Sequence, residues 1–131
     1  MTDIDFISTD KAAKPRGHYS QATVYMGTIY VATQLGIVPH QDPVVVGPIE
    51  EQVLQALKNV QEILTAAGSD INRVLKVTLY VSDISLWNTI NTVYAEFFGQ
   101  HKPARAVIPI KELHHGFQVA IDVIAATGLE Q

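Results

Sequence analysis

The stretch KPARAVIP, residues 102–109, marks the point where a helical pattern stops and a buried strand starts. Gly99 and Pro103 interrupt the preceding helix, and the apolar, β-branched residues after Arg105 are typical of a strand. Arg105 therefore lies near the start of a strand, among apolar neighbours. An unpaired charge there is costly, and the planar guanidinium suits a carboxylate, which it can bind through both oxygens. That carboxylate could belong to a protein side chain or to a substrate, and this stretch alone leaves both open.

The composition is that of one folded domain covering residues 1–131, because 47% of the residues are hydrophobic and only 17% are charged. The net charge is −4 without a cluster of Lys or Arg, which argues against nucleic acid as a partner. So few charges in a small domain favour burial of part of the surface between copies of the chain.

The absence of cysteine excludes disulfides, thiol nucleophiles and cysteine-ligated metals, and it is consistent with a reducing compartment. The first residues are acidic and the apolar runs are short, so we expect no signal peptide, no membrane span and a cytoplasmic protein. The five histidines lack the spacing of a metal site, and no phosphate loop, dinucleotide fingerprint or serine elbow occurs. The sequence therefore predicts neither a metal nor another cofactor.

Hydrophobic periodicity predicts two amphipathic helices and five strands in the order β-β-α-β-α-β-β. Pro48 suits the first helical position, Gly68 ends the first helix, and Ser85 is the expected cap of the second. A sheet with both helices on one face is the simplest arrangement, and its other face would need a cover. The expected strands cover residues 23–25, 28–34, 71–81, 104–110 and 116–125, and the helices cover 48–67 and 85–98.

Strict alternation along each strand assigns its residues to the two faces of this sheet. In the second strand, Thr33 should share a face with Ile29 and Val31. In the third, Leu75 should share a face with Val77.

Three polar residues are candidates for a site on this scaffold. Asp122 alternates with apolar residues in the last strand, so its carboxylate is either an outward surface group or part of a cleft in which it accepts a proton from water. Tyr19 precedes the first hairpin and is either a packing residue or a group that orients a ligand. Asn91 lies beside the apolar stripe of the second helix, where a solvated side chain is the simplest interpretation.

Short motifs distributed over nearly the whole chain resemble those of the RidA/YjgF family, the enamine/imine deaminases also labelled L-PSP endoribonucleases. The motifs are GHYSQA (17–22), KVT (76–78), VSD (81–83), NTVY (91–94), FF (97–98) and PAR (103–105), together with Gln34. The resemblance implies an α+β, chorismate-mutase-like fold, β-β-α-β-α-β-β, with the helices on one face of a mixed sheet. It also implies a homotrimer with an inner barrel and clefts between the subunits.

The same resemblance implies roles for individual residues. Arg105 matches the arginine that binds the substrate carboxylate, Tyr19 matches a tyrosine that lines the cleft, and Asn91 matches the asparagine before the helix tyrosine. Asp122 aligns with the last-strand glutamate that orients water, and Val107 lies at a further substrate-contacting position.

The chain also departs from the family pattern. His18 replaces a proline, and Ala32 and Thr33 replace a Ser-Gly pair. Val107 stands where cysteine or a small polar residue is frequent, and Asp122 is one methylene shorter than glutamate. A Cβ at Thr33 narrows the substrate-binding pocket compared with glycine. Carboxylate binding is thus preserved, whereas the hydrolytic part of the site is altered.

The function that the resemblance implies is hydrolysis of small 2-imino or enamino acids to 2-oxo acids and ammonia, with Arg105 binding the carboxylate and Asp122 orienting water. The same cleft could instead bind small carboxylates or 2-oxo acids without turnover, which the altered Ala32, Thr33 and Asp122 favour. RNA cleavage is the third possibility, raised by the older family label. The acidic charge and the lack of a basic patch argue against it.

Overall fold

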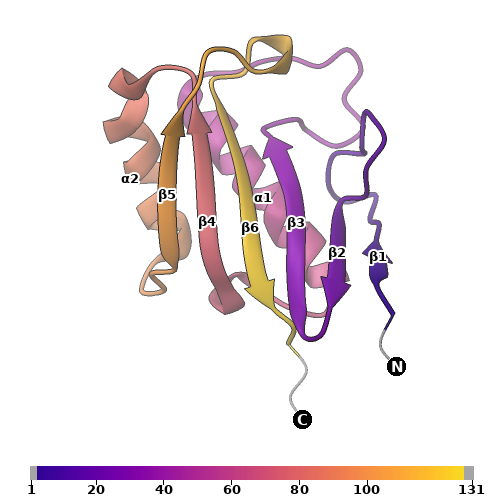
Figure 1. The fold of residues 1–131 in the computed structure, drawn as a ribbon. Coiled ribbons are helices and arrows are strands. Elements are labelled where there is room, and N and C mark those ends of the chain that lie inside the picture. Colours follow the sequence, from indigo (N-terminus) through magenta and orange to yellow (C-terminus); the bar gives the residue numbers. More distant parts are fainter. Residues whose placement is uncertain (1–2, 129–131) are drawn as a thin grey trace.

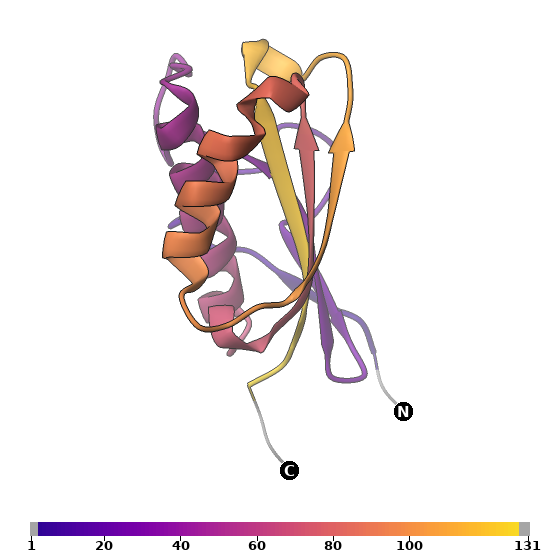
Figure 2. The same cartoon turned by 90° about the vertical axis from the view of Figure 1, so that its left-hand side faces the viewer.

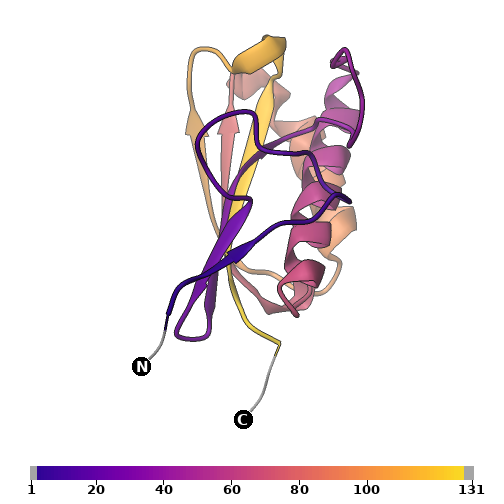
Figure 3. The ribbon, with the colours of Figure 1, turned by 90° about the vertical axis from the view of Figure 1, so that its right-hand side faces the viewer.

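The computed structural model describes residues 3–128, which form one six-stranded sheet with two α-helices against it (Figure 1). Figures 2 and 3 show both helices on the same side of the sheet. The expected α+β class, with helices on one face of a mixed sheet, is therefore confirmed. The strands are β1 (Asp5–Ile7), β2 (Ala22–Tyr25), β3 (Thr28–Leu35), β4 (Val74–Val81), β5 (Ala104–Pro109) and β6 (Val119–Ala126); the helices are α1 (Ile49–Ala66) and α2 (Trp87–Phe98), and the short 3-10 helices are η1 (Ile71–Arg73), η2 (Ile84–Leu86) and η3 (His114–Gly116).

The strand order across the sheet is β1-β2-β3-β6-β4-β5, so the last strand of the chain lies near the middle. All neighbouring pairs are antiparallel except β4 and β5, which are parallel and are connected through α2. β1 was not predicted, because its three residues are too few to show a pattern. It extends the sheet at the β2 edge.

The core lies between the sheet and the apolar face of α1. Val53, Leu57, Val60 and Leu64 recur at three- and four-residue steps along that helix, and all four are buried. Pro48 proves to be the N-cap residue rather than the first helical residue, a difference of one position. The helix ends before Gly68, whose φ of +79° lies in the left-handed region and whose N–H bonds to a carbonyl of the last turn.

A β-bulge in β3 overturns the expected orientation of Thr33. Val31 pairs with Val123 and Gln34 pairs with Ile121, so two residues of β3 lie opposite Asp122 alone. The extra residue reverses the alternation: Gln34 is buried on the helix side with Val31, and Thr33 is exposed on the opposite face.

Further expectations fail at strand and helix boundaries. A second irregularity, between Val74 and Lys76, leaves Leu75 52% exposed instead of on the buried face. Ser85 does not cap a helix; its N–H donates to the carboxylate of Asp83, which caps η2 ahead of α2. The last strand begins at Val119 rather than at residue 116, because the preceding residues turn through η3.

The sheet face without helices, here the open face, carries large apolar side chains. Phe6, Tyr30 and Ile108 are 68%, 50% and 41% exposed, and the register of their strands places them on this face. Asp122 and Thr33 also lie on the open face: Thr33 is on β3 with Tyr30, and Asp122 is on β6, between the strands that carry Tyr30 and Ile108. No described helix is both long and apolar enough to cross a bilayer.

Candidate functional site

Arg105 is held by one face of α2. Trp87, Asn91 and Tyr94 follow one another at steps of four and three residues, so they project from the same side of the helix. An Nη1 of Arg105 donates to Oδ1 of Asn91 at 2.8 Å, and the guanidinium carbon lies 4.7 Å from the Trp87 ring centroid and 4.9 Å from that of Tyr94. We name these four residues the Arg105 corner. Within residues 3–128, the described contacts of this guanidinium are thus an amide and two aromatic rings, not a carboxylate.

Tyr94 belongs both to this corner and to the core. Burial raises the pKa of its phenol, and the positive charge of Arg105 opposes that shift. Its hydroxyl oxygen is buried without a hydrogen-bond partner among the described residues. The Tyr94 ring therefore lies against the guanidinium as a flat surface. Stacking of this kind orients the plane of the guanidinium but does not neutralise its charge.

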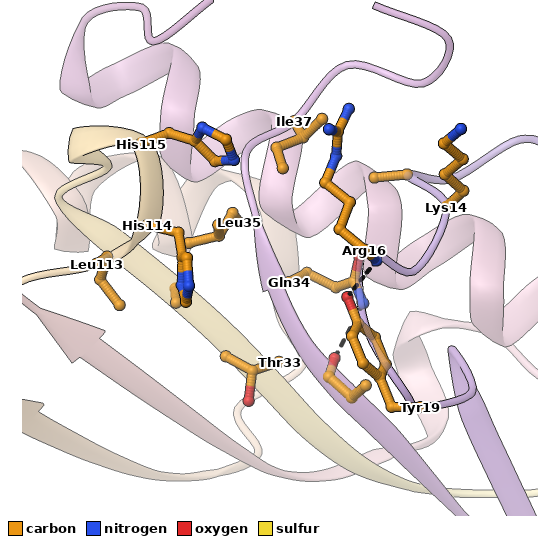
Figure 4. A pocket seen from close by; sticks show the side chains of 13 residues that line it. Lys14, Arg16, Tyr19, Thr33, Gln34, Leu35, Ile37, Leu113, His114 and His115 are labelled. Carbon is orange, nitrogen blue, oxygen red and sulfur yellow. Dashed lines mark hydrogen bonds between the residues drawn. The ribbon is translucent and has the colours of Figure 1, made fainter. Parts of the chain in front are cut away.

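A second candidate region, the histidine pocket, opens where the upper ends of β3 and β6 in Figure 1 meet the loop before β2 and the turn η3 (Figure 4). The cavity volume is about 630 Å³. The lining combines small and apolar side chains with two cations, Lys14 and Arg16, and two imidazoles, His114 and His115. The lining residues are Ala13, Lys14, Arg16, Tyr19, Ala32, Thr33, Gln34, Leu35, Ile37, Leu113, His114, His115 and Ala120.

Buried amide side chains hold the walls of this pocket in place. Gln21 accepts from the N–H of Thr9 and donates to the carbonyl of Ala13, which fixes the loop before β2. Asn59 on α1 donates to the carbonyl oxygens of Leu35 and Ile37 at 3.3 and 2.9 Å. These amides satisfy loop backbone that the sheet cannot pair. Sequence reasoning missed them, because a glutamine or asparagine within a helical or strand pattern looks like a surface residue.

Gln52 ties the same helix to the segment that leads into β6. Its side chain donates to the carbonyl of Gly47 at 2.8 Å and accepts from the N–H of Gln118 at 2.8 Å. The side chain is 2% exposed, so both bonds are shielded from water. The pocket therefore depends on contacts between segments that are far apart in the chain.

Comparison with known proteins identifies the family. The family model described as Endoribonuclease L-PSP matches residues 9–127. The chain belongs to this family. The resemblance to the RidA/YjgF proteins is thereby confirmed.

Relatives of this L-PSP family member include a human 2-iminobutanoate/2-iminopropanoate deaminase, 41% identical over 93% of this chain and 89% of the human protein. Among solved structures, RidA from the Antarctic bacterium Psychrobacter sp. superposes with a TM-score of 0.88 at 33% identity, covering 93% of this chain and 98% of that one. TdcF from E. coli, solved with bound serine, superposes with a TM-score of 0.89 at 26% identity, covering 95% of this chain and 99% of that one.

Asp122, which was expected to orient water in the substrate cleft, is instead hydrogen-bonded to a neighbouring strand. Its Oδ2 accepts a hydrogen bond from the Thr33 hydroxyl at 2.8 Å, a contact that only the β3 bulge makes possible. Tyr80 on β4 also lies near: partial burial raises the pKa of this phenol, and the negative charge of Asp122 adds to the shift. Asp122 is not among the residues that line the histidine pocket, whereas Ala120, two positions earlier on the same face of β6, is.

In this chain, the residues expected to contact one substrate lie in two separate places, the histidine pocket and the Arg105 corner, which contains Arg105 and Asn91. Tyr19, Ala32 and Thr33 line the histidine pocket. Arg105 is paired in register with Val77, which is buried on the helix side, so the Arg105 corner and the open face lie on opposite sides of the sheet.

β6 and β4 separate the pocket strand β3 from the Arg105 strand β5, so a single chain does not bring the two groups together. Val107, expected to contact substrate, packs partly buried against the core. Among the described residues, no group of three or more His, Cys, Asp or Glu side chains is arranged to hold a metal ion.

Proposed function

We propose that this protein hydrolyses small 2-imino or enamino acids to 2-oxo acids and ammonia. The observation that carries the proposal is the Arg105 corner: a guanidinium oriented by an amide and two rings, without a carboxylate of its own among the described residues. Such a group is arranged to bind a planar anion, and the smallest planar anion common to amino, imino and oxo acids is the carboxylate. Relatives named as 2-iminobutanoate/2-iminopropanoate deaminases, about 41% identical, support the reaction.

Besides the arginine that binds the carboxylate, the hydrolysis of an imine requires only a water molecule and a group that takes a proton from it. A protonated imine is already electrophilic, so the protein must hold the substrate, admit one water and remove a proton from it. Arg105 would hold the carboxylate, with Asn91 keeping the guanidinium in plane. Tyr19, Ala32 and Thr33 would shape the opposite wall. The E. coli TdcF structure contains serine, whose carboxylate is of the kind proposed for Arg105.

We propose further that the active form is a homotrimer in which Arg105 of one subunit faces the histidine pocket of the next. Two observations support this: the open face exposes Phe6, Tyr30 and Ile108, and one chain does not bring Arg105 to the pocket. Sedimentation velocity should give three times the monomer mass at micromolar concentration. A stable monomer would remove the shared cleft and the site with it.

A coupled assay tests the activity. An amino-acid oxidase or a threonine dehydratase releases 2-imino acid, and 2-oxo acid formation is timed with and without this protein. We expect faster appearance of the 2-oxo acid in proportion to the protein added. An unchanged rate, together with measurable affinity for 2-oxobutyrate, would instead support a carboxylate-binding protein without turnover, which the alanine at position 120 in the pocket also favours.

A further inference from the structure

Among the described residues, the lining of the histidine pocket includes no carboxylate, because β6 contributes Ala120 rather than an acid. Ala120 is the residue of β6 that lines the pocket, and it is 1% exposed. The nearest acid on the same face, Asp122, accepts a hydrogen bond from Thr33 and lies beside the Tyr80 phenol. A carboxylate engaged in this way on the open face is not oriented into the cavity, so the pocket needs another group to take a proton from water.

Few groups of the pocket can do this near neutral pH. Lys14 and Arg16 are cations and cannot accept a proton, and the Tyr19 phenol is a donor that itself accepts from the N–H of Arg16 at 3.4 Å. The two imidazoles of η3, His114 and His115, are the remaining titratable side chains of the lining. Imidazole both accepts and donates protons in the neutral range.

The two histidines are not equivalent. Figure 4 shows His114 and His115 on the wall opposite Tyr19 and Arg16, with the His114 side chain directed toward Thr33. His115 has a φ of +63°, and its ring lies edge-on to the buried Phe117 at a centroid distance of 6.3 Å. His115 therefore serves to turn the chain and pack against Phe117, whereas the His114 ring is directed along the cavity toward Thr33.

We propose that the imidazole of His114 is the proton-transferring group of the deaminase site in this chain, in place of a β6 carboxylate; this inference rests on the proposed function. The oxygen of water bonds to the imine carbon while His114 takes one proton from that water, giving a carbinolamine. The imidazolium returns the proton to the amino nitrogen. The C–N bond then breaks as the hydroxyl gives its proton to His114 and ammonia leaves. The imidazolium passes that proton to the ammonia, so a protonated imine and water yield a 2-oxo acid and ammonium, with His114 neutral again.

The test compares His114→Gln with His115→Gln, Asp122→Asn and, as a matched control on an exposed histidine outside the pocket, His40→Asn. For His114→Gln we expect kcat to fall on the order of 10²-fold with KM nearly unchanged, the usual scale for one general base. The His115 and Asp122 variants should lose less than about tenfold, and His40→Asn should match the parent. His114→Ala should regain turnover as free imidazole is added, whereas His115→Ala should not.

Thermal unfolding of each variant shows whether the loss comes from misfolding. A folded His114→Gln with parental kcat, or an Asp122→Asn that loses on the order of 10²-fold while His114→Gln does not, would overturn the assignment and return the role to the β6 acid. Failure of the proposed function looks different, because the parent protein itself would then show no acceleration in the coupled assay; that result would overturn both.

Discussion

The Arg105 corner and the histidine pocket differ in how they are built. In the corner, three residues of a single helical face hold one arginine of the following strand. In the pocket, a bulge in β3, a loop fixed by Gln21 and a turn before β6 come from three separate parts of the chain. The first arrangement is nearly local in sequence, and the second exists only once α1 and the sheet have packed.

This difference has a functional consequence. An arginine held by residues that are close to it in the chain can be recognised from a short motif, and its supports do not depend on distant parts of the fold. A pocket assembled from distant segments can differ in its chemical groups, such as Ala120 on β6 and His114 on η3, while the Arg105 corner stays the same. We therefore expect substitutions in the corner to alter ligand affinity, and those in the pocket to alter turnover or stability.

The largest expected effect follows Arg105→Lys. A point charge replaces a planar fork, so affinity for 2-oxobutyrate should fall by about 1.5–3 kcal/mol, roughly 10- to 150-fold. The melting temperature should change little, because the contacts of Arg105 are an amide and two rings rather than a buried carboxylate. Calorimetry and thermal unfolding on the same preparation measure both. Parental affinity with a large loss of stability would make Arg105 a structural residue.

Gly36→Ala tests the dependence of the pocket on packing. A Cβ at this position would lie 2.5 Å from the carbonyl oxygen of Gln52 and 2.9 Å from its Cα, so α1 would have to move away from β3. We expect a loss of about 1–3 kcal/mol in the free energy of unfolding, the cost of overpacking a tight contact. Gly17→Ala is the control, since its Cβ would meet only the Tyr19 ring at ordinary contact distance. Equal denaturation midpoints for the two variants would contradict the argument.

Asn91→Ala probes the orientation of Arg105. The variant loses one hydrogen bond to a charged group that stays solvated, which costs about 0.5–1.5 kcal/mol. We therefore expect kcat/KM for imine hydrolysis to fall roughly 2- to 12-fold, mainly because KM rises. Asn88→Ala, an exposed position one turn earlier on α2, should have no effect. Steady-state kinetics of the two variants decide whether the amide positions the guanidinium or is incidental to it.

The smallest effect concerns Tyr80 and alkaline pH. Partial burial and the charge of Asp122 raise the pKa of this phenol, so its neutral form is favoured in the folded state. The contribution of this phenol to the stability of the fold is fully present below its unfolded-state pKa of about 10, and it is lost as the pH rises through its higher pKa in the folded state. Tyr80→Phe should remove this part of the alkaline loss of stability, and Asp122→Asn should reduce it. Phenolate absorbance titrations, compared between parent and variants, report the shift directly.

Much of the fold could be read from the sequence, because its signals are local. The apolar steps of α1, the positive-φ glycine after it and the PAR motif ahead of β5 each express a preference of a few neighbouring residues. The two failures of face assignment, at Thr33 and Leu75, share one cause. Strict alternation assumes an unbroken ladder, and a bulge that inserts one residue is set by the partner strand rather than by the strand itself.

The sequence by itself determined the helices, most strands, the family and the place of Arg105 in a PAR motif ahead of β5, since each depends on short-range pattern or motif. Only the tertiary structure decided that Asp122 bonds to Thr33, that Ala120 faces the pocket and that His114 joins it. These contacts link residues up to 89 positions apart. Their formation is fixed by sheet register and by two buried amides, Asn59 on α1 and Gln21 just before β2, which no local preference encodes.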